Sequence, residues 1–421
     1  MSWADIFKTN AFSVALAPQA TDINTAGSSW TWINCDFPQL SYEPSQTDTK
    51  RSRQARGAGS VRGTGKVWPR LAIKFPLHGQ LSTYAYASDT PSMVGAMRLL
   101  DWLGGTAGIA YQAAGINSTD GNTMSLVTSQ GKLGCLIAAR ESSGAVQAMG
   151  FAKTIGSGGP YSTDLFEDLA ALPGASTGRL PTYTIYPSAT QPQPLTVRVT
   201  GEAASQDRRF IGGFPKKITL APDQDDRWYA TCELIFYGGE NRAGGAGGFQ
   251  TQLDYLALEP QLGRGNSRWV LGSNVLTSFN DATVDPDGTC DVRDPEIVIE
   301  FDHYVSRVGT KSQGVKEVIM GQPTVTTSLT VPDISDFEVS TEHFGEKAWR
   351  DLTQVSCSLY MGDTPGRLFA YNMPRGNITV WPDPVVVDDA LHRRISLEAG
   401  PYSGDAASTD AGNKSVRISV G

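Results

Sequence analysis

Hydrophobic and polar residues alternate with a period of two along much of the chain. In the segment 66–78 the odd-numbered positions carry the apolar side chains Val67, Leu71, Ile73, Phe75 and Leu77. The other face carries Arg70, Lys74 and His78. The same alternation recurs in segments 195–200, 216–220, 228–237, 324–331, 394–399 and 415–420. The pattern predicts half-buried antiparallel strands, with Pro69 and Pro76 placing the first of them near a sheet edge or a bulge.

Helical periodicity is confined to three short segments. The first follows Thr90-Pro91, a pair typical of a helix start, and ends before Gly104-Gly105. The other two are 163–172 and 341–352. Glycine and proline, 45 and 24 of 421 residues, exceed their usual share and favour many turns. The sequence therefore predicts an all-β fold with minor helices, and it disfavours a doubly wound parallel sheet.

The length of 421 residues predicts two or three domains. A glycine-rich segment, 238–248, follows a predicted strand that ends at Tyr237, and it is interpreted as a linker. We expect a first domain at 1–240 and a second at 241–421. Each side has a strand, a segment with basic residues, a further strand, a helix candidate and two closing strands, which suggests an internal duplication.

Motifs for catalysis or metal binding are not evident in the sequence. It contains no Walker loop, no G-x-S-x-G and no H-E-x-x-H, and its four histidines are dispersed. The five cysteines form no CxxC pair and are expected to be buried thiols. Asp285–Asp291 could gather around Ca²⁺, but an Asp-Gly turn explains it as well. The sequence thus predicts no catalytic residue, no cofactor and no metal.

Charge is unevenly distributed along the chain. Eight basic residues and no carboxylate lie between Thr49 and Leu77, although the whole chain carries a net charge of −8 and the remainder therefore −16. Three interpretations are open: a solvated loop, a nucleic-acid patch with few stacking aromatics, or a contact with another copy of the same acidic protein. A head-to-tail contact of the third kind would build a stack or filament.

Several segments together resemble bacteriophage tail tube proteins. Gly212–Leu220 followed by Tyr229–Gly238 is similar to the late hairpin of a tube domain. Tyr371–Val380, Arg394–Pro401 and Val416–Gly421 resemble the carboxyl-terminal end of such proteins. The resemblance implies two tandem tube-type β-sandwich or barrel domains, since one tube domain is usually near half this length. It further implies that three copies form a pseudo-hexameric ring, and that rings stack into a hollow tube.

The same resemblance implies the partners and the location of the protein. These are further copies of itself, a tape measure protein, a tail terminator, and viral DNA that passes through the lumen without specific binding. An acidic wall would repel phosphate. The protein would be made in the host cytoplasm and reside in the virion tail; no apolar stretch long enough for a membrane span and no signal peptide is expected. The predicted inter-ring contact residues are Lys50, Arg51, Arg53, Arg56 and Arg62, with segment 307–316 as their less basic counterpart.

Two alternative functions remain open at this point. A baseplate hub or other minor tail protein of the same fold would differ in copy number rather than in local residues. A glycan-binding or glycan-cleaving tail protein would need exposed aromatics beside carboxylates, and Trp228 near Asp225 and Trp381 near Asp383 are the candidates.

Overall fold

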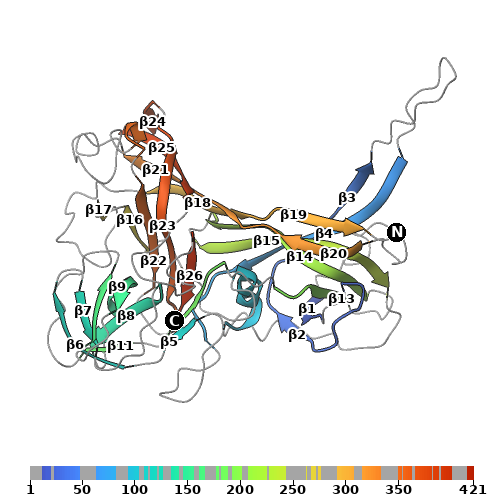
Figure 1. Cartoon of the computed structure of the whole chain (residues 1–421), viewed down its shortest axis with the longest axis horizontal. Helices are drawn as coiled ribbons and strands as arrows, with labels where there is room; N and C mark the ends of the chain where they lie inside the picture. Colours follow the sequence, from blue (N-terminus) through green and yellow to red (C-terminus); the bar gives the residue numbers. More distant parts are fainter. Residues whose placement is uncertain are drawn as a thin grey trace.

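Most of the residues that the structure describes lie in β-strands, as the alternating pattern predicts (Figure 1). The computed structural model describes residues 12–19, 23–47, 63–81, 93–103, 109–111, 114–120, 123–126, 134–141, 146–155, 161–165, 177–179, 182–187, 192–201, 207–224, 227–242, 262, 267–271, 274–275, 292–307, 315–332, 349–352, 354–362, 366–381, 383–387, 390–400 and 415–421. The all-β class is therefore confirmed.

Seven strands of the first half of the chain form one antiparallel sheet, here called the first repeat. Their spatial order is β2-β1-β13-β14-β15-β4-β3, so the chain crosses over twice rather than meandering. The strands are β1 (Phe12–Pro18), β2 (Thr31–Ile33), β3 (Gln39–Thr47), β4 (Gly63–Pro76), β13 (Leu195–Gly201), β14 (Arg208–Pro222) and β15 (Trp228–Arg242).

Seven strands of the second half, the second repeat, have the same arrangement. Their spatial order is β17-β16-β22-β23-β25-β21-β18, and every pair is again antiparallel. The strands are β16 (Ser267–Leu271), β17 (Asn274–Val275), β18 (Arg293–Glu300), β21 (Thr324–Pro332), β22 (Val355–Met361), β23 (Phe369–Val380) and β25 (Ala390–Ala399). If the seven strands of each repeat are numbered in chain order, both sheets have the spatial order 2-1-5-6-7-4-3.

The two repeats also agree in strand register, residue by residue. The pair Pro76↔Tyr229 of β4 and β15 corresponds to Pro332↔His392 of β21 and β25. Bulges recur as well. The register shifts between Pro215 and Lys217 in β14 and between Ile378 and Val380 at the equivalent place in β23. Since a slip of one residue would reverse the faces of a strand, the two sheets present equivalent positions to the same side.

Two additional strands complete the second repeat. The single strand β14 is matched by β23 and then β24 (Val385–Val387), which pairs with β25. The far end of β15 is matched by the last strand, β26 (Arg417–Val420), which pairs with β23. A separate hairpin, β19 (His303–Arg307) and β20 (Val315–Met320), occupies the place in the chain where the first repeat has the connection between β3 and β4.

A large insertion lies between β4 and β13 of the first repeat. It begins with a 3-10 helix, η1 (Gly95–Leu103), and the strand β5 (Ile109–Tyr111), and it closes with β12 (Thr182–Ile185), which pairs with β5 and β26. Six further strands pair in a closed circuit, β10-β7-β6-β11-β8-β9. They are β6 (Ala114–Asp120), β7 (Thr123–Leu126), β8 (Leu136–Glu141), β9 (Val146–Ile155), β10 (Tyr161–Leu165) and β11 (Thr177–Arg179).

One hydrophobic core joins both sides of the expected domain boundary at residue 240. Its members include Ile73, Leu220 and Leu234 of the first repeat and Ile297 and Leu397 of the second. A second cluster packs Leu136 and Phe151 of the insertion against Tyr360 and Ala370 of the second repeat. The described parts of the two repeats therefore share a core, and the division at 240 stays a prediction.

Several local expectations need correction. Segment 163–172 is not helical in its described part. Thr163 and Leu165 belong to strand β10, which pairs with β7 and β9. The first helix starts at Gly95 rather than at the expected Thr90-Pro91. Gly95 has a φ of 57°, in the left-handed region that favours glycine. In the third candidate, the described residues Trp349 and Arg350 are helical.

The glycine-rich segment is also partly strand rather than linker. Gly238 lies inside β15, which continues to Arg242 because its pairing with β14 continues that far. A Cβ atom on Gly238 would collide with the carbonyl oxygen atoms of Ile23 and Ile211, so this glycine permits close packing of backbones. The remaining residues of 238–248, from 243 on, lie outside the described residues.

Strand β4 lies between β3 and β15, so it is not at an edge of the sheet. It does have the other expected feature, a bulge near Pro69, because its register with β3 shifts between Thr64 and Val67, opposite Gln46 and Pro44. Its prolines fall where the pairing ends: Pro69 is one residue beyond the last β15 partner, and Pro76 is the last residue of the strand. On its predicted apolar face, Leu71, Ile73, Phe75 and Leu77 are fully buried but Val67 is exposed, because β4 there extends beyond the body as part of an arm with β3 (Figure 1). His78, expected to point outward, is buried.

Candidate functional site: the junction between the two repeats

The predicted inter-ring contact residues belong to the segment of the chain between strands β3 and β4. Lys50, Arg51, Arg53, Arg56 and Arg62 fall outside the described residues. The strands that flank this segment are described, and they form the arm of β3 and β4 that extends away from the body (Figure 1).

The repeats are joined by pairing between strand β14 of the first and strand β18 of the second. Lys217 to Leu220 pair with Glu300 to Ile297 in an antiparallel register. Strand β14 uses the same side for β13 at its beginning and for β18 further along, while β15 covers its other side. The side chains of Ile218 and Ile299 are directly paired across this junction and fully buried in the shared core. The junction thus closes a sheet edge of the second repeat.

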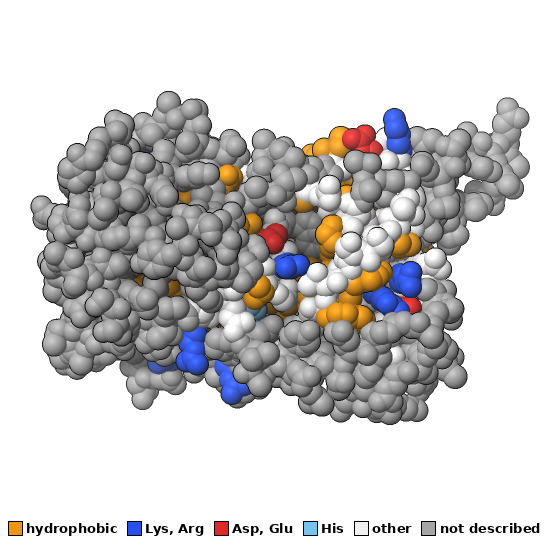
Figure 2. Space-filling model, turned by 90° about the horizontal axis from the view of Figure 1, so that it is seen from below, with side chains coloured by type: hydrophobic (Ala, Val, Ile, Leu, Met, Phe, Trp, Pro, Cys, Tyr) orange, Lys and Arg blue, Asp and Glu red, His pale blue; other side chains and the backbone are white. Residues whose placement is uncertain are grey.

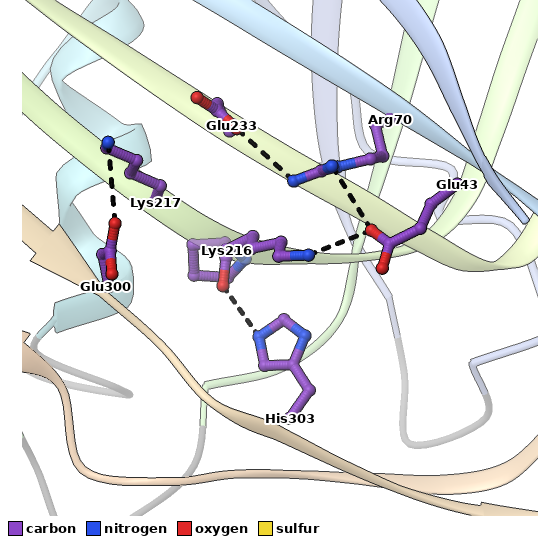
Figure 3. Close-up of polar contacts among 8 residues, drawn as sticks. Glu43, Arg70, Lys216, Lys217, Glu233, Glu300 and His303 are labelled. Atoms are coloured by element: carbon purple, nitrogen blue, oxygen red, sulfur yellow. Dashed lines mark hydrogen bonds and ion pairs between the residues drawn. The ribbon is translucent and has the colours of Figure 1, made fainter. Parts of the chain in front are cut away.

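Ion pairs cover the outward face of the junction (Figure 3). Glu43 of β3 lies 3.0 Å from the Lys216 ammonium and 3.4 Å from the Arg70 guanidinium, which also lies 3.5 Å from Glu233. These groups are partly exposed. Pairs of this kind contribute at most about 1 kcal/mol each, and they set register and orientation more than stability.

The pair that crosses between the repeats joins Lys217 to Glu300. Its Nζ and Oε1 atoms are 3.5 Å apart, and the residues are also backbone partners in β14 and β18. Position 217 follows the bulge in β14, which turns Lys216 and Lys217 toward two different acceptors. The residues at this bulge therefore form ion pairs on both sides of β14, with Glu43 of β3 and with Glu300 of β18.

His303, the first residue of hairpin β19–β20, anchors that hairpin to the first repeat (Figure 3). Its Nε2 donates to the carbonyl oxygen of Pro215 at 2.8 Å. A carbonyl can only accept, so Nδ1 of the neutral ring accepts from the Tyr237 hydroxyl at 2.8 Å. Burial lowers the pKa of His303 and raises that of Tyr237, which keeps both groups uncharged near neutral pH.

Apolar contacts extend this anchor. Residues Val315 and Val318 of the hairpin are buried against the outward face of the first repeat, in a cluster with Trp68, Phe214, Ile235 and Tyr237. The rings of Trp68 and Tyr237 meet edge to face at a centroid distance of 4.8 Å. The second repeat therefore holds the first at two places: an edge strand joins the sheet, and a hairpin covers its face.

Each repeat has one strand edge that is equivalent to an edge used in the junction but has no partner strand among the described residues. Among the described strands, β3 pairs only with β4, whereas its equivalent β18 pairs with both β21 and β14. On the other end, β22 covers β23 only up to Gly376. Exposed apolar side chains concentrate beyond that point and include Val380, Val385, Val386 and Leu391.

The remaining chemistry of the described residues offers no competing site. No group of three or more His, Cys, Asp or Glu side chains in this part of the chain is placed to hold a metal ion, and Asp285–Asp291 lies outside it. Cys35, Cys135, Cys232 and Cys357 are buried free thiols, as expected. Trp228 is fully buried beside Trp269, so it is no exposed sugar platform, and Trp381 carries the Arg393 guanidinium over its ring.

Charged side chains on the face shown in Figure 2 do not gather into one patch of a single sign among the residues drawn in colour. The blue Lys and Arg side chains stand apart in small groups, between apolar and neutral ones. A continuous cationic surface for phosphate binding is therefore not visible on this part of the molecule.

Comparison with known proteins gives no family for this chain: neither a family model nor a curated protein matches it. Within the described residues, no helix has both the length and the apolar character that crossing a membrane requires. The interpretation of the junction therefore rests on its own residues.

Sequence reasoning found strand β14 of the junction but not the junction itself. Glu43, Lys217 and Glu300 stand at ordinary outward positions, and nothing in their local sequence indicates long-range partners. The shared order of elements in the two halves was the one available signal, because equivalent strands must have equivalent edges.

Proposed function

We propose that this protein is a structural, self-assembling subunit of a bacteriophage tail, the major tail tube protein, in a form with two tube-type units in one chain. The observation that supports this most is the repeated sheet whose second copy docks on the first edge to edge. A head-to-tail contact between equivalent units uses different surfaces on each, so it leaves one of each open and can be continued by further chains.

Charge supports the same proposal. With its basic arm set aside, the chain carries a net charge of −16, so a channel lined by many copies would repel a phosphate backbone. DNA could then move through the lumen without adhering to the wall. We propose three chains, hence six units, in each ring, and a stack of such rings as the tube.

The arm of β3 and β4 fits a contact between stacked rings. It extends away from the body and leads into Lys50, Arg51, Arg53, Arg56 and Arg62 (Figure 1). Because the rest of the chain is acidic, these cations would be attracted to the neighbouring ring. Tape measure and terminator proteins would bind the lumen and the end of the tube.

Negative-stain electron microscopy of the purified chain tests the function directly. Hollow rods with a regular axial repeat are expected at high protein concentration and moderate salt. Reversal of Arg51, Arg53 and Arg56 to glutamate should leave single rings or soluble subunits, whereas Lys316→Glu, in the less basic counterpart, should still give rods. Tubes of normal length from the triple variant would refute the role of the arm, and a wild-type chain that never assembles would refute the function.

A further inference from the structure

The junction inside the chain is a template for a contact between two chains. Each repeat offers two elements: an edge strand, β18 or β3, and the side of an inner strand, β14 or β23 with β24. Within one chain, β18 of the second repeat uses the side of β14. Among the described strands, the edge of β3 and the side of β23 beyond Gly376 have no such partner.

We propose that β3 of one copy pairs in an antiparallel register with the end of β23 in the next copy, with Glu43 opposite Val380 and Tyr42 opposite Trp381. This register follows from the equivalence of the repeats. Glu43↔Trp68 matches Glu300↔Thr324, and Lys217↔Glu233 matches Val380↔Ser396. The internal pair Lys217↔Glu300 therefore becomes Val380↔Glu43 between copies. The contact rests on the proposed function and specifies its partner, a second copy of this chain.

The side chains at these positions suit an interface that forms between separate chains. Next to Lys217↔Glu300 in the internal junction, the paired residues Ile218 and Ile299 are wholly buried. Their equivalents are Trp381, which packs partly against the core, and Tyr42, which is 51% exposed. Tyrosine and tryptophan tolerate water before association and contribute strongly once buried, so they are favoured at such contacts.

Exposed apolar surface lies at the same place. Val380 is 48% exposed and Val386 is 70% exposed, both along the side that β23 and β24 would present to the incoming strand. Clustered exposed valines beside a strand edge that pairs with no described strand promote association. A second copy gives this strand edge backbone partners through its β3, and it places β3 side chains beside Val380.

Charge does not oppose this contact. Val380 replaces the lysine of the internal junction, so Glu43 gains no cation from the neighbour. It already has two in its own chain, since Arg70 and Lys216 lie 3.4 and 3.0 Å away. The carboxylate can therefore approach Val380 without being buried as an unpaired charge.

Cysteine cross-linking tests the register. Directly opposed residues in an antiparallel pair have Cβ atoms about 4.5–5.5 Å apart, close enough for a disulfide after small adjustments. Cys290 is first replaced by serine, because the other four native cysteines are buried. The double variant Glu43→Cys with Val380→Cys is then assembled and mildly oxidised. The product is run on a non-reducing denaturing gel. We expect more than half of the protein in covalent dimers and higher species that collapse to monomer on reduction.

Two matched variants control the result. Lys217→Cys with Glu300→Cys should cross-link within one chain and run as a monomer of altered mobility. Glu43→Cys with Leu391→Cys, exposed but out of register, should give at least fivefold less covalent dimer. A mixture of two chains that carry Glu43→Cys and Val380→Cys singly should give dimers alone, which shows that the bond joins different copies.

The outcomes separate this contact from the function on which it rests. If electron microscopy shows rods or rings but the Glu43–Val380 variant gives no more dimer than the Leu391 control, the contact is wrong and the function stands. If the wild-type chain remains monomeric under all assembly conditions, both are wrong.

Discussion

Gly213 in β14 and Gly376 in β23 occupy the same position in the two repeated sheets. Each pairs with the first residue of the preceding strand, Leu195 in one case and Val355 in the other, directly beside a register shift. A Cβ atom on Gly213 would lie 3.0 Å from the Leu195 carbonyl oxygen, and one on Gly376 would lie 3.4 Å from that of Val355. Two strands approach closely at both places, so the same residue type meets the same steric demand.

Alanine at these two glycines should have unequal effects. At Gly213 the new methyl group would also lie 2.5 Å from a ring carbon of the buried Phe236, which cannot move aside, so we expect a loss of ~1–3 kcal/mol in the free energy of unfolding. At Gly376 the nearest atom is the sulfur of Met373, at 2.7 Å, and a methionine side chain can adjust. The loss there should stay below ~1 kcal/mol. Thermal unfolding of both variants measures the difference, and equal losses would contradict the argument.

Burial of isoleucine, rather than the surface ion pairs, should hold the junction of the two repeats together. Ile299 is fully buried opposite Ile218, so Ile299→Ala should cost ~2–4 kcal/mol in the free energy of unfolding. Lys217→Ala removes only a partly exposed ion pair and should cost less than ~1 kcal/mol. Ile319→Ala, at a 50% exposed position, is the matched control and should change stability by less than ~0.5 kcal/mol. Urea unfolding would contradict this ranking if Lys217→Ala proved the most damaging.

The hydrogen bond from Tyr237 to His303 should contribute measurably to the docking of the β19–β20 hairpin. Tyr237→Phe keeps the ring contacts but leaves His303 Nδ1 without its donor, and we expect a loss of ~1–2 kcal/mol. Tyr304→Phe changes the same group at a neighbouring position that is 66% exposed and should have little effect. Amide hydrogen exchange in residues 315–320 should rise in the first variant only. Unchanged exchange there would show that the apolar cluster alone holds the hairpin.

The sequence predicted the strands well but not their long-range partners. Alternation places Ile73, Phe75 and Leu397 in the core, since side chains two residues apart share a face. It could not reveal that Lys217 pairs with Glu300, because both are ordinary outward residues and their pairing depends on the whole sheet. Thr163 and Leu165 show the opposite problem: helical spacing is present locally, but pairing with β7 and β9 determines the conformation.

The carboxyl group of Asp101 in helix η1 should make the stability of the protein fall as the pH rises. Burial raises its pKa to about 7, although nearby Arg98 lowers it. Its Oδ1 atom is buried and has no hydrogen-bond partner within the described structure. The folded protein therefore keeps a proton that the unfolded chain releases near its ordinary pKa of 3.8, so stability decreases as the pH rises from about 4 to about 7 and then levels off. Each pKa unit corresponds to ~1.4 kcal/mol.

Asp101→Asn removes this titration while keeping the shape of the side chain. We expect the variant to be ~1–4 kcal/mol more stable than the wild type at pH 8 and nearly equal to it at pH 4. Asp351→Asn, at an exposed position, is the control and should show no such gain. Thermal unfolding across this pH range, at constant ionic strength, measures the difference. A gain from Asp101→Asn that is the same at pH 4 and pH 8 would show that the effect arises from packing rather than from a retained proton.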